Sequence, residues 1–141
     1  MPDAAPRPLI GAHFLVDLGV GDPASPDAGF CEVIFPTFRF ALDDAREPPP
    51  DAGPGAERLV LRRGATGAHD LYIWWDKARR GKAPQRRTVT VSLLDAEFAV
   101  VLRWRFRNAR PVSLRYSPLR AVDGAIVFET IELEYDRVEM C

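Results

Sequence analysis

The sequence predicts a mainly β fold, an antiparallel β-sandwich or small barrel of about seven strands with one short α-helix near residues 70–80. The first observation is a series of short segments in which apolar and polar residues alternate, a period typical of half-buried strands. Turns rich in Gly, Pro and Asp separate these segments. Only one stretch carries apolar residues at helical spacing, and a single helix needs the apolar surface that flanking strands provide.

Three strands are predicted before the helix. The first spans residues 13–18 and the third spans residues 58–63. Between them, residues 30–42 form a second strand region. Pro36 interrupts this strand or confines it to a sheet edge, because proline cannot donate a ladder hydrogen bond.

The segments between these strands have little capacity to form a core. Residues 1–8 are rich in Pro and Ala and are expected to form a flexible N-terminal arm. Residues 19–29 carry closely spaced turn residues. Residues 43–57, DDAREPPPDAGPGAE, form a Pro-rich loop that either stays mobile or becomes ordered against a partner.

The helix is expected to begin at Asp70 and to end at Gly81. The Asp70 carboxylate can accept hydrogen bonds from the free N–H groups of the first turn. Gly81 can adopt the left-handed conformation that closes a helix. The residues that fall on one side of this helix, at i, i+3, i+4 and i+7, are Leu71, Trp74, Trp75 and Ala78.

A β-hairpin follows the helix, with strands at residues 86–95 and 98–107. In the second strand Trp104 and Phe106 face the core. Pro111 is expected to end this strand. The residues that dock the helix on the core are therefore expected to be Leu71, Trp74, Trp75, Trp104 and Phe106. The opposite face of the second strand carries Arg103, Arg105 and Arg107.

Two more strands complete the prediction. Residues 112–116 form a short strand, and residues 125–135 form the longest one. Glu132 and Glu134 share one face of the last strand. Glu129 lies on the other, apolar face, so we expect it to meet a polar group at a sheet edge or on a neighbouring molecule.

The bulk properties fit one domain spanning residues 1–141. Hydrophobic residues make up 47% and charged residues 28%, as in ordinary globular proteins. A net charge of −1 argues against specific nucleic-acid recognition, and the sequence has no apolar run long enough for membrane insertion. Cys31 and Cys141 fit no metal or redox motif, and both a disulfide and two free thiols remain open.

We predict no catalytic, cofactor-binding or metal site. His13 and His69 have no third ligand at a metal-like spacing. The sequence lacks a Gly-rich phosphate loop and a GxSxG motif. Glu132 and Glu134 could reach the separation of a glycosidase carboxylate pair, but nothing in the sequence predicts a sugar cleft.

Several motifs follow one another between residues 12 and 135. The segment AGFCEV occupies residues 28–33. The pattern LxLxRGxTxxxxLxxW is matched by Leu59, Leu61, Arg63, Gly64, Thr66, Leu71 and Trp74. The hairpin pattern RxVxIxLLD followed by WxFxNAxP is matched by Arg87, Val89, Val91, Leu93, Leu94, Asp95, Trp104, Phe106, Asn108, Ala109 and Pro111. The closing strand pattern is matched by Ala125, Val127, Glu129, Thr130, Ile131 and Leu133.

In this order the motifs resemble those of the tail-tube protein family of contractile phages. That family includes the inner-tube proteins of extracellular contractile injection systems and is related in fold to the type VI secretion protein Hcp. The resemblance implies a structural subunit that assembles with copies of itself into hexameric rings, which stack into a hollow conduit. It implies sheath and baseplate or spike proteins as further partners, and DNA or protein cargo in the lumen. It also implies assembly in the bacterial cytoplasm as part of a phage tail or injection particle.

Two departures from the family pattern leave alternatives open. The step after AGFCEV reads IFPTFRF instead of ending in glycine, and the chain closes with YDRVEMC. A tube-initiator ring at the baseplate of the same machinery is therefore one alternative. A stand-alone ligand-binding β-sandwich is a more distant one. In the family, the arm corresponding to residues 43–57 reaches a neighbouring subunit.

The charged strand faces supply the candidate contact residues. A positive strip on one subunit that meets a negative strip on the next would set the register of a ring. The residues predicted to lie at the lumen or at the subunit interface are Arg103, Arg105, Arg107, Glu129, Glu132 and Glu134.

Overall fold

The computed structural model describes residues 7–19, 29–39, 58–81 and 86–141. The predicted Pro-rich loop at residues 43–57 and most of the predicted N-terminal arm lie outside the described residues. The elements, in chain order, are β1 (Phe14–Asp17), β2 (Phe30–Ile34), β3 (Leu59–Gly64), α1 (Asp70–Arg79), β4 (Arg87–Leu94), β5 (Val100–Tyr116), β6 (Phe128–Glu134) and β7 (Arg137–Met140).

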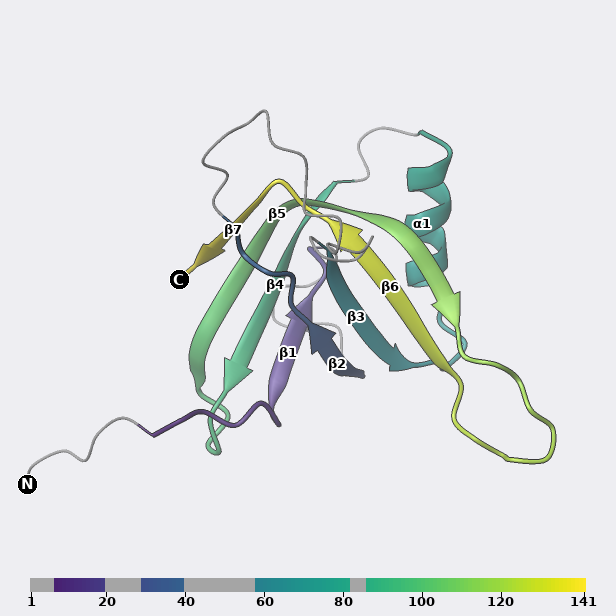
Figure 1. The fold of residues 1–141 in the computed structure, drawn as a ribbon, viewed down its shortest axis with the longest axis horizontal. Helices are drawn as coiled ribbons and strands as arrows, with labels where there is room; N and C mark the ends of the chain where they lie inside the picture. Colours follow the sequence, from purple (N-terminus) through teal and green to yellow (C-terminus); the bar gives the residue numbers. More distant parts are fainter. Residues whose placement is uncertain (1–6, 20–28, 40–57, 82–85) are drawn as a thin grey trace, which may run out of the picture.

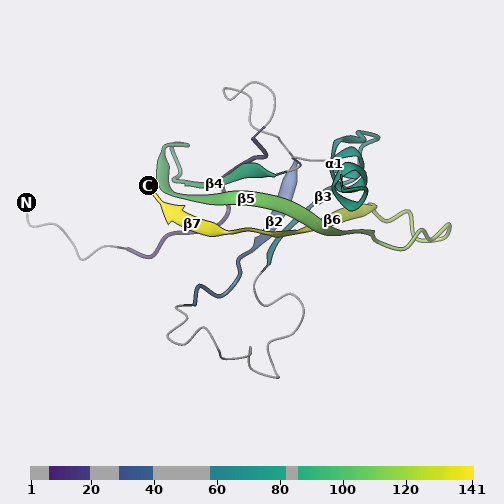
Figure 2. The ribbon, with the colours of Figure 1, turned by 90° about the horizontal axis from the view of Figure 1, so that it is seen from above.

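The strands form an antiparallel sheet in the order β1-β4-β5-β6-β3-β2, with β7 paired to β5. The first part of β5 pairs with β4 and its last part pairs with β6, so this one strand belongs to both halves of the sheet (Figures 1 and 2). The predicted mainly β fold with one helix is confirmed. The sheet is not closed, because among the described strands β1 pairs only with β4 and β2 only with β3.

The two strands predicted at 98–107 and 112–116 are one continuous strand of 17 residues, β5. Pro111 does not end it, which corrects the prediction. The ladder between β5 and β6 shifts register between Pro111 and Ser113, and a bulge tolerates the missing proline N–H. By contrast, β2 does end at Ile34, shortly before Pro36.

The end of the chain contains a strand that the sequence did not predict. Residues 137–140 form β7 and pair with β5, with Arg105 opposite Glu139 and Phe106 opposite Val138. The predicted last strand at 125–135 is correspondingly shorter and begins at Phe128. Residues 117–127 form a loop that projects away from the sheet (Figure 1).

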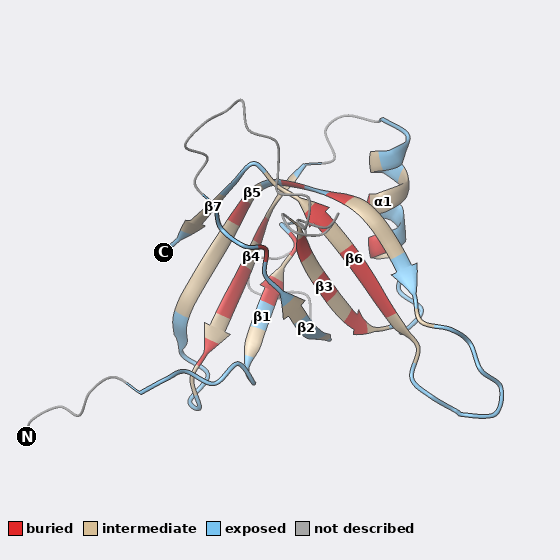
Figure 3. Ribbon diagram, viewed as in Figure 1, coloured by how far each residue is buried: buried red, intermediate tan, exposed pale blue. Residues whose placement is uncertain are grey.

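The core lies between the curved sheet and α1. Its fully buried side chains come from the central strands β3, β4, β5 and β6, from β1 and the residue that follows it, and from the helix (Figure 3). They are Val16, Leu18, Leu59, Leu61, Leu71, Trp74, Val89, Val91, Phe106, Ala109, Ile131 and Leu133. Burial of this apolar surface is the main stabilising contribution to the fold.

The helix docks through Leu71 and Trp74, which are both fully buried. Trp75 was also predicted to dock the helix on the core, but it is only half-buried. The guanidinium carbon of Arg79 lies 5.1 Å from its ring centre. Gly81 has a φ of +69° just beyond the helix end, as the closing residue requires. Within the described ranges, no helix has the length and apolar character needed to cross a bilayer.

Candidate functional site

Alternation along β5 places Arg103, Arg105 and Arg107 on one face of the sheet and the core residue Phe106 on the other. The Arg103 Nε donates a hydrogen bond of 3.2 Å to the Ser92 hydroxyl on β4. The Arg107 Nε donates one of 2.5 Å to a carboxylate oxygen of Glu139 on β7. The neighbouring strands therefore hold these arginines in place while leaving them half-exposed.

This face, which we call the arginine face, also includes Arg137 of β7. On β7 the arginine face also carries the acidic residue Glu139. A guanidinium nitrogen of Arg137 lies 3.8 Å from a carboxylate oxygen of Glu139. The hydrogen bond from Arg107 is the largest influence and lowers the pKa of Glu139; burial opposes it, and the charges of Arg107, Arg137 and Arg105 lower the pKa further. Glu139 is therefore ionised at neutral pH, and Arg105, Arg107 and Arg137 all act on this one carboxylate.

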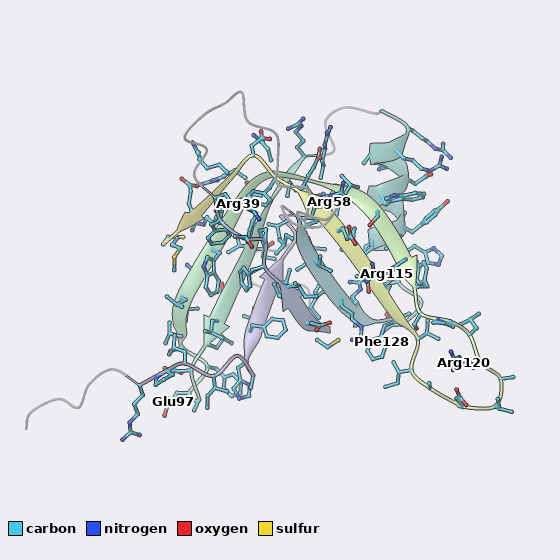
Figure 4. The ribbon with its side chains drawn as sticks, viewed as in Figure 1. Arg39, Arg58, Glu97, Arg115, Arg120 and Phe128 are labelled. Atoms are coloured by element: carbon cyan, nitrogen blue, oxygen red, sulfur yellow. The ribbon has the colours of Figure 1, made fainter. Side chains whose placement is uncertain are left out.

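The carboxylates of β6 are paired within the chain. Glu132 accepts hydrogen bonds from Arg58 at 3.4 Å and from Arg115 at 3.2 Å, and both arginines are labelled in Figure 4. Glu134 pairs with Arg110 of β5. The negative strip predicted from the sequence is thus matched by arginines of β5 and by Arg58, just before β3. Glu132 is 19% exposed in this arrangement.

A buried ion cluster joins β3, β6 and α1. The Arg63 Nε donates a hydrogen bond of 2.5 Å to Glu129, whose side chain is 3% exposed. The other end of the Arg63 guanidinium binds both carboxylate oxygens of Asp70, one of them at 3.2 Å. The ring of Phe30 lies 5.2 Å from the guanidinium carbon of Arg63. Glu129 is therefore buried inside its own chain, with Arg63 as its polar partner.

The cluster shifts the pKa values of its members. Burial alone would raise the pKa of Asp70, but the hydrogen bonds and positive charge of Arg63 lower it. Burial alone would lower the pKa of Arg63, but its bonds to Asp70 and Glu129 raise it. Burial and the negative charge of Glu129 raise the pKa of Tyr116, which lies opposite Glu129 in the ladder. Arg63 and Asp70 are therefore both ionised at neutral pH.

Sequence reasoning did not identify this cluster. Asp70 was expected to cap the helix, but the N-cap is His69, which makes no side-chain capping bond. The Asp70 carboxylate, at the first position of the helix, binds Arg63, and hydrogen bonds from the backbone N–H groups of Leu71 and Asp70 in the first turn also lower its pKa. The sequence did carry a signal for a buried ion pair. Arg63 follows Leu59 and Leu61 on the inward face of β3, and Glu129 precedes Ile131 on the inward face of β6. Two opposite charges on inward faces predict a buried pair.

The other polar residues that the structure describes form contact surfaces. Among the described residues, no group of three or more His, Cys, Asp or Glu side chains is placed to hold a metal ion. Cys31 and Cys141 are both free and exposed. The arrangement thus offers charged and apolar contact surfaces.

Comparisons with known proteins place this fold among tube proteins. The sequence model of the family described as T4-like virus tail tube protein gp19 matches residues 52–139. No protein with a curated description matches the sequence significantly.

Several solved structures contain chains of similar fold. A chain in the cryo-EM structure of the PVC sheath/tube terminator, from an extracellular contractile injection system, has a TM-score of 0.75 and 23% identity over 98% of this chain and 99% of its own. A chain in that of the anti-feeding prophage tube-terminating cap has a TM-score of 0.75 and 19% identity over 100% of this chain and 95% of its own. Hcp1 from Flavobacterium johnsoniae has a TM-score of 0.58 and 14% identity over 90% of this chain and 93% of its own.

Proposed function

The chain belongs to the family of the T4-like virus tail tube protein gp19, and from this premise we propose that it is a structural subunit of the inner tube of a contractile phage tail or phage-tail-like injection system. In this role the single domain of residues 1–141 assembles into hexameric rings, and the rings stack into a hollow conduit. The family match carries the proposal. The full-length similarity to chains in the PVC and anti-feeding prophage structures supports it.

The open sheet is the structural feature that suits such assembly. The outer edges of β1 and β2 have no strand partner among the described residues. Unpaired edges present N–H and C=O groups that a neighbouring chain can bind, and natural proteins cover or pair long edges of this kind. A closed ring of copies would supply those partners through a heterologous interface.

We place the arginine face at the lumen or at the seam between subunits. Its four arginines, three of which act on the single β7 carboxylate of Glu139, form a surface that favours acidic groups on a neighbour or water in a channel. Glu132 and Glu134 remain candidates for the seam, because their arginine partners are partly exposed and can be exchanged. We assign Glu129 to the interior of the subunit, where Arg63 binds it.

The proposed partners are the surrounding sheath and the proteins of the baseplate or spike. A ring at one end of the tube is the second candidate role. It is favoured by the similarity to chains in structures of a tube-terminating cap, a tube terminator and a baseplate. Such a ring would form hexamers that do not stack indefinitely, and it would contact a cap, hub or spike.

Electron microscopy of the purified protein, together with light scattering, tests the proposal. We expect six-fold rings, which stack into tubes if the chain is the repeating subunit and stay as single rings if it is a terminal one. A particle of 15.7 kDa at every concentration would contradict both roles and favour a stand-alone binding domain.

Charge reversal tests the place of the arginine face. The variant Arg103→Glu with Arg105→Glu is expected to abolish ring formation, or to make it strongly dependent on salt, because two positive charges become negative at the seam or lumen. The control variant Lys77→Glu with Arg80→Glu changes the charge equally on the exposed side of α1. Circular dichroism would verify that both variants fold. If the first variant forms normal rings with unchanged salt dependence, the arginine face does not lie at the interface between subunits.

A further inference from the structure

The loop between β5 and β6 exposes an apolar tip. Residues 118–126 are all exposed, and the exposed fractions of Leu119, Val122 and Ile126 are 82%, 94% and 69%. The loop projects beyond the end of the sheet in two perpendicular views (Figures 1 and 2). Its own chain therefore leaves these aliphatic side chains in water, which is unfavourable unless another surface covers them.

The base of this loop is fixed by hydrogen bonds. The Ser117 N–H donates to the Phe128 carbonyl oxygen at 2.9 Å, and the Phe128 N–H donates to the Ser117 hydroxyl at 2.8 Å. Near the tip, Arg120 approaches Asp123 at 3.8 Å, so the charges of the tip balance. The loop thus presents a neutral, mainly aliphatic projection on a defined stem.

An apolar recess lies where the unpaired edges of β1 and β2 approach each other. Its volume is about 290 Å³, far above the roughly 10–15 Å³ that admits one water molecule. Phe14, Val33, Phe35, Val91, Leu93 and Trp104 form its apolar wall. Cys31 and Glu32 also line it, and both are exposed. An open recess with such a wall binds apolar side chains better than water.

We propose that the tip of loop 118–126 in one copy of the chain fits into the β1–β2 recess of the next copy. The loop points away from β1 and β2 of its own chain in both views, so the two surfaces meet between copies. Because the two surfaces differ, the contact is heterologous and continues around a ring or along a stack. This inference rests on the proposed function, and it names one pair of surfaces that assembly brings together.

Charge complementarity supports a second copy as the occupant. The loop tip carries Arg120 and the recess carries Glu32. Their partners within the chain are distant, 3.8 Å for Arg120 to Asp123 and 3.4 Å for Glu32 to Arg62, and all of these groups are exposed. Exposed pairs of this kind contribute little, so Arg120 can exchange its partner for Glu32 of the neighbour and fix the orientation of the loop.

The free thiol of Cys31 allows a direct test. We would introduce Val122→Cys in a chain that also carries Cys141→Ser, assemble it and oxidise it mildly. We expect disulfide-linked dimers and higher multimers on a non-reducing gel, because Cys31 of one copy lies beside position 122 of the next. Adding Cys31→Ser should abolish the cross-link. The matched control Glu97→Cys places a thiol in the exposed β4–β5 turn, at the other end of the molecule (Figure 4), and should give no ladder.

Alkylation of Cys31 by a maleimide supplies a second readout. We expect the thiol to react in the dilute monomer, where it is exposed, and to be protected after assembly. Rings or tubes that form without the cross-link and with a reactive Cys31 would overturn this inference and leave the proposed function intact. A Cys31 that is already protected in the monomer would show that the chain's own residues cover the recess, which would also overturn it. If no rings form, the proposed function fails, and this inference fails with it.

Discussion

At the scale of single residues, Arg63 connects three parts of the fold. One guanidinium binds Glu129 on the adjacent strand and Asp70 at the first position of α1. Two carboxylates share one buried cation, and five N–H donors in a rigid fork suit such a shared site. Lysine at this position could not bind both carboxylates in the same geometry. The orientation of α1 on the sheet therefore depends on this side chain as well as on Trp74.

Removing the guanidinium should strongly destabilise the chain. In Arg63→Met the Glu129 carboxylate stays buried without a cation, and breaking a buried pair in this way costs about 3–5 kcal/mol of the free energy of unfolding. The double variant Arg63→Met with Glu129→Leu should recover much of this loss, because no unpaired buried charge remains. Urea denaturation of the three chains measures the difference. Equal destabilisation in the single and double variants would show that the ion pair itself, and not the unpaired carboxylate, determines the cost.

The lowered pKa of Asp70 makes part of the stability depend on acid pH. Its folded pKa lies below 3.8, the ordinary value, because Arg63 binds the ionised form. This contribution is complete at neutral pH and is lost as the pH falls below that ordinary value and through the folded pKa. The difference in melting temperature between the wild type and Asp70→Asn should therefore be constant from about pH 7 to about pH 5 and shrink in more acid solution. A difference that stays constant to about pH 2.5 would contradict the assigned role of Asp70.

At the scale of elements, local patterns predicted the helix and the β4–β5 hairpin. Both depend on neighbours in sequence: apolar spacing within α1, and alternation on either side of the Asp95–Ala99 turn. The continuation of β5 past Pro111 was not predictable in this way, because it depends on a bulge opposite β6. Nor was β7, whose four residues become a strand by pairing with β5.

The same limit applies to the candidate site. Alternation within one strand predicted that Arg103, Arg105 and Arg107 share a face. The pairing of Glu132 with Arg58 and Arg115 depends on the registers of three strands, which one sequence does not reveal. The recess between β1 and β2 likewise requires the order of strands in the sheet.

The backbone conformation of β5 at Asn108 leads to a prediction at this scale. Asn108 has a φ of +56°, a left-handed conformation that asparagine tolerates and β-branched residues do not. Asn108→Val should therefore lower the free energy of unfolding by about 1–2 kcal/mol relative to Asn108→Gly, because both variants lose the bond to Asp136 but only valine is strained. Thermal and urea denaturation would measure this difference. Equal stability of the two variants would mean that β5 relieves the strain by changing its backbone at this position.

At the scale of the whole molecule, the chain leaves several surfaces incomplete. The outer edges of β1, β2 and β7 lack strand partners among the described residues, one face carries excess positive charge, and an apolar loop and an apolar recess lie apart. A monomer in water satisfies none of these surfaces well. Assembly of identical copies would give all of these surfaces a partner at the same time. The subunit therefore completes its structure only in the ring.

The position of β5 also has a consequence for how the chain folds as it is synthesised. Its early residues hold β4 and β7, and its late residues hold β6, which in turn carries β3 and β2. A nascent chain that ends before residue 100 contains only two separate strand pairs, β1 with β4 and β2 with β3, and an isolated two-stranded pair is marginally stable at best. Once β5 and β6 have left the ribosome, both halves of the sheet can form almost simultaneously. The chain should therefore fold late in its synthesis, in a nearly all-or-none step.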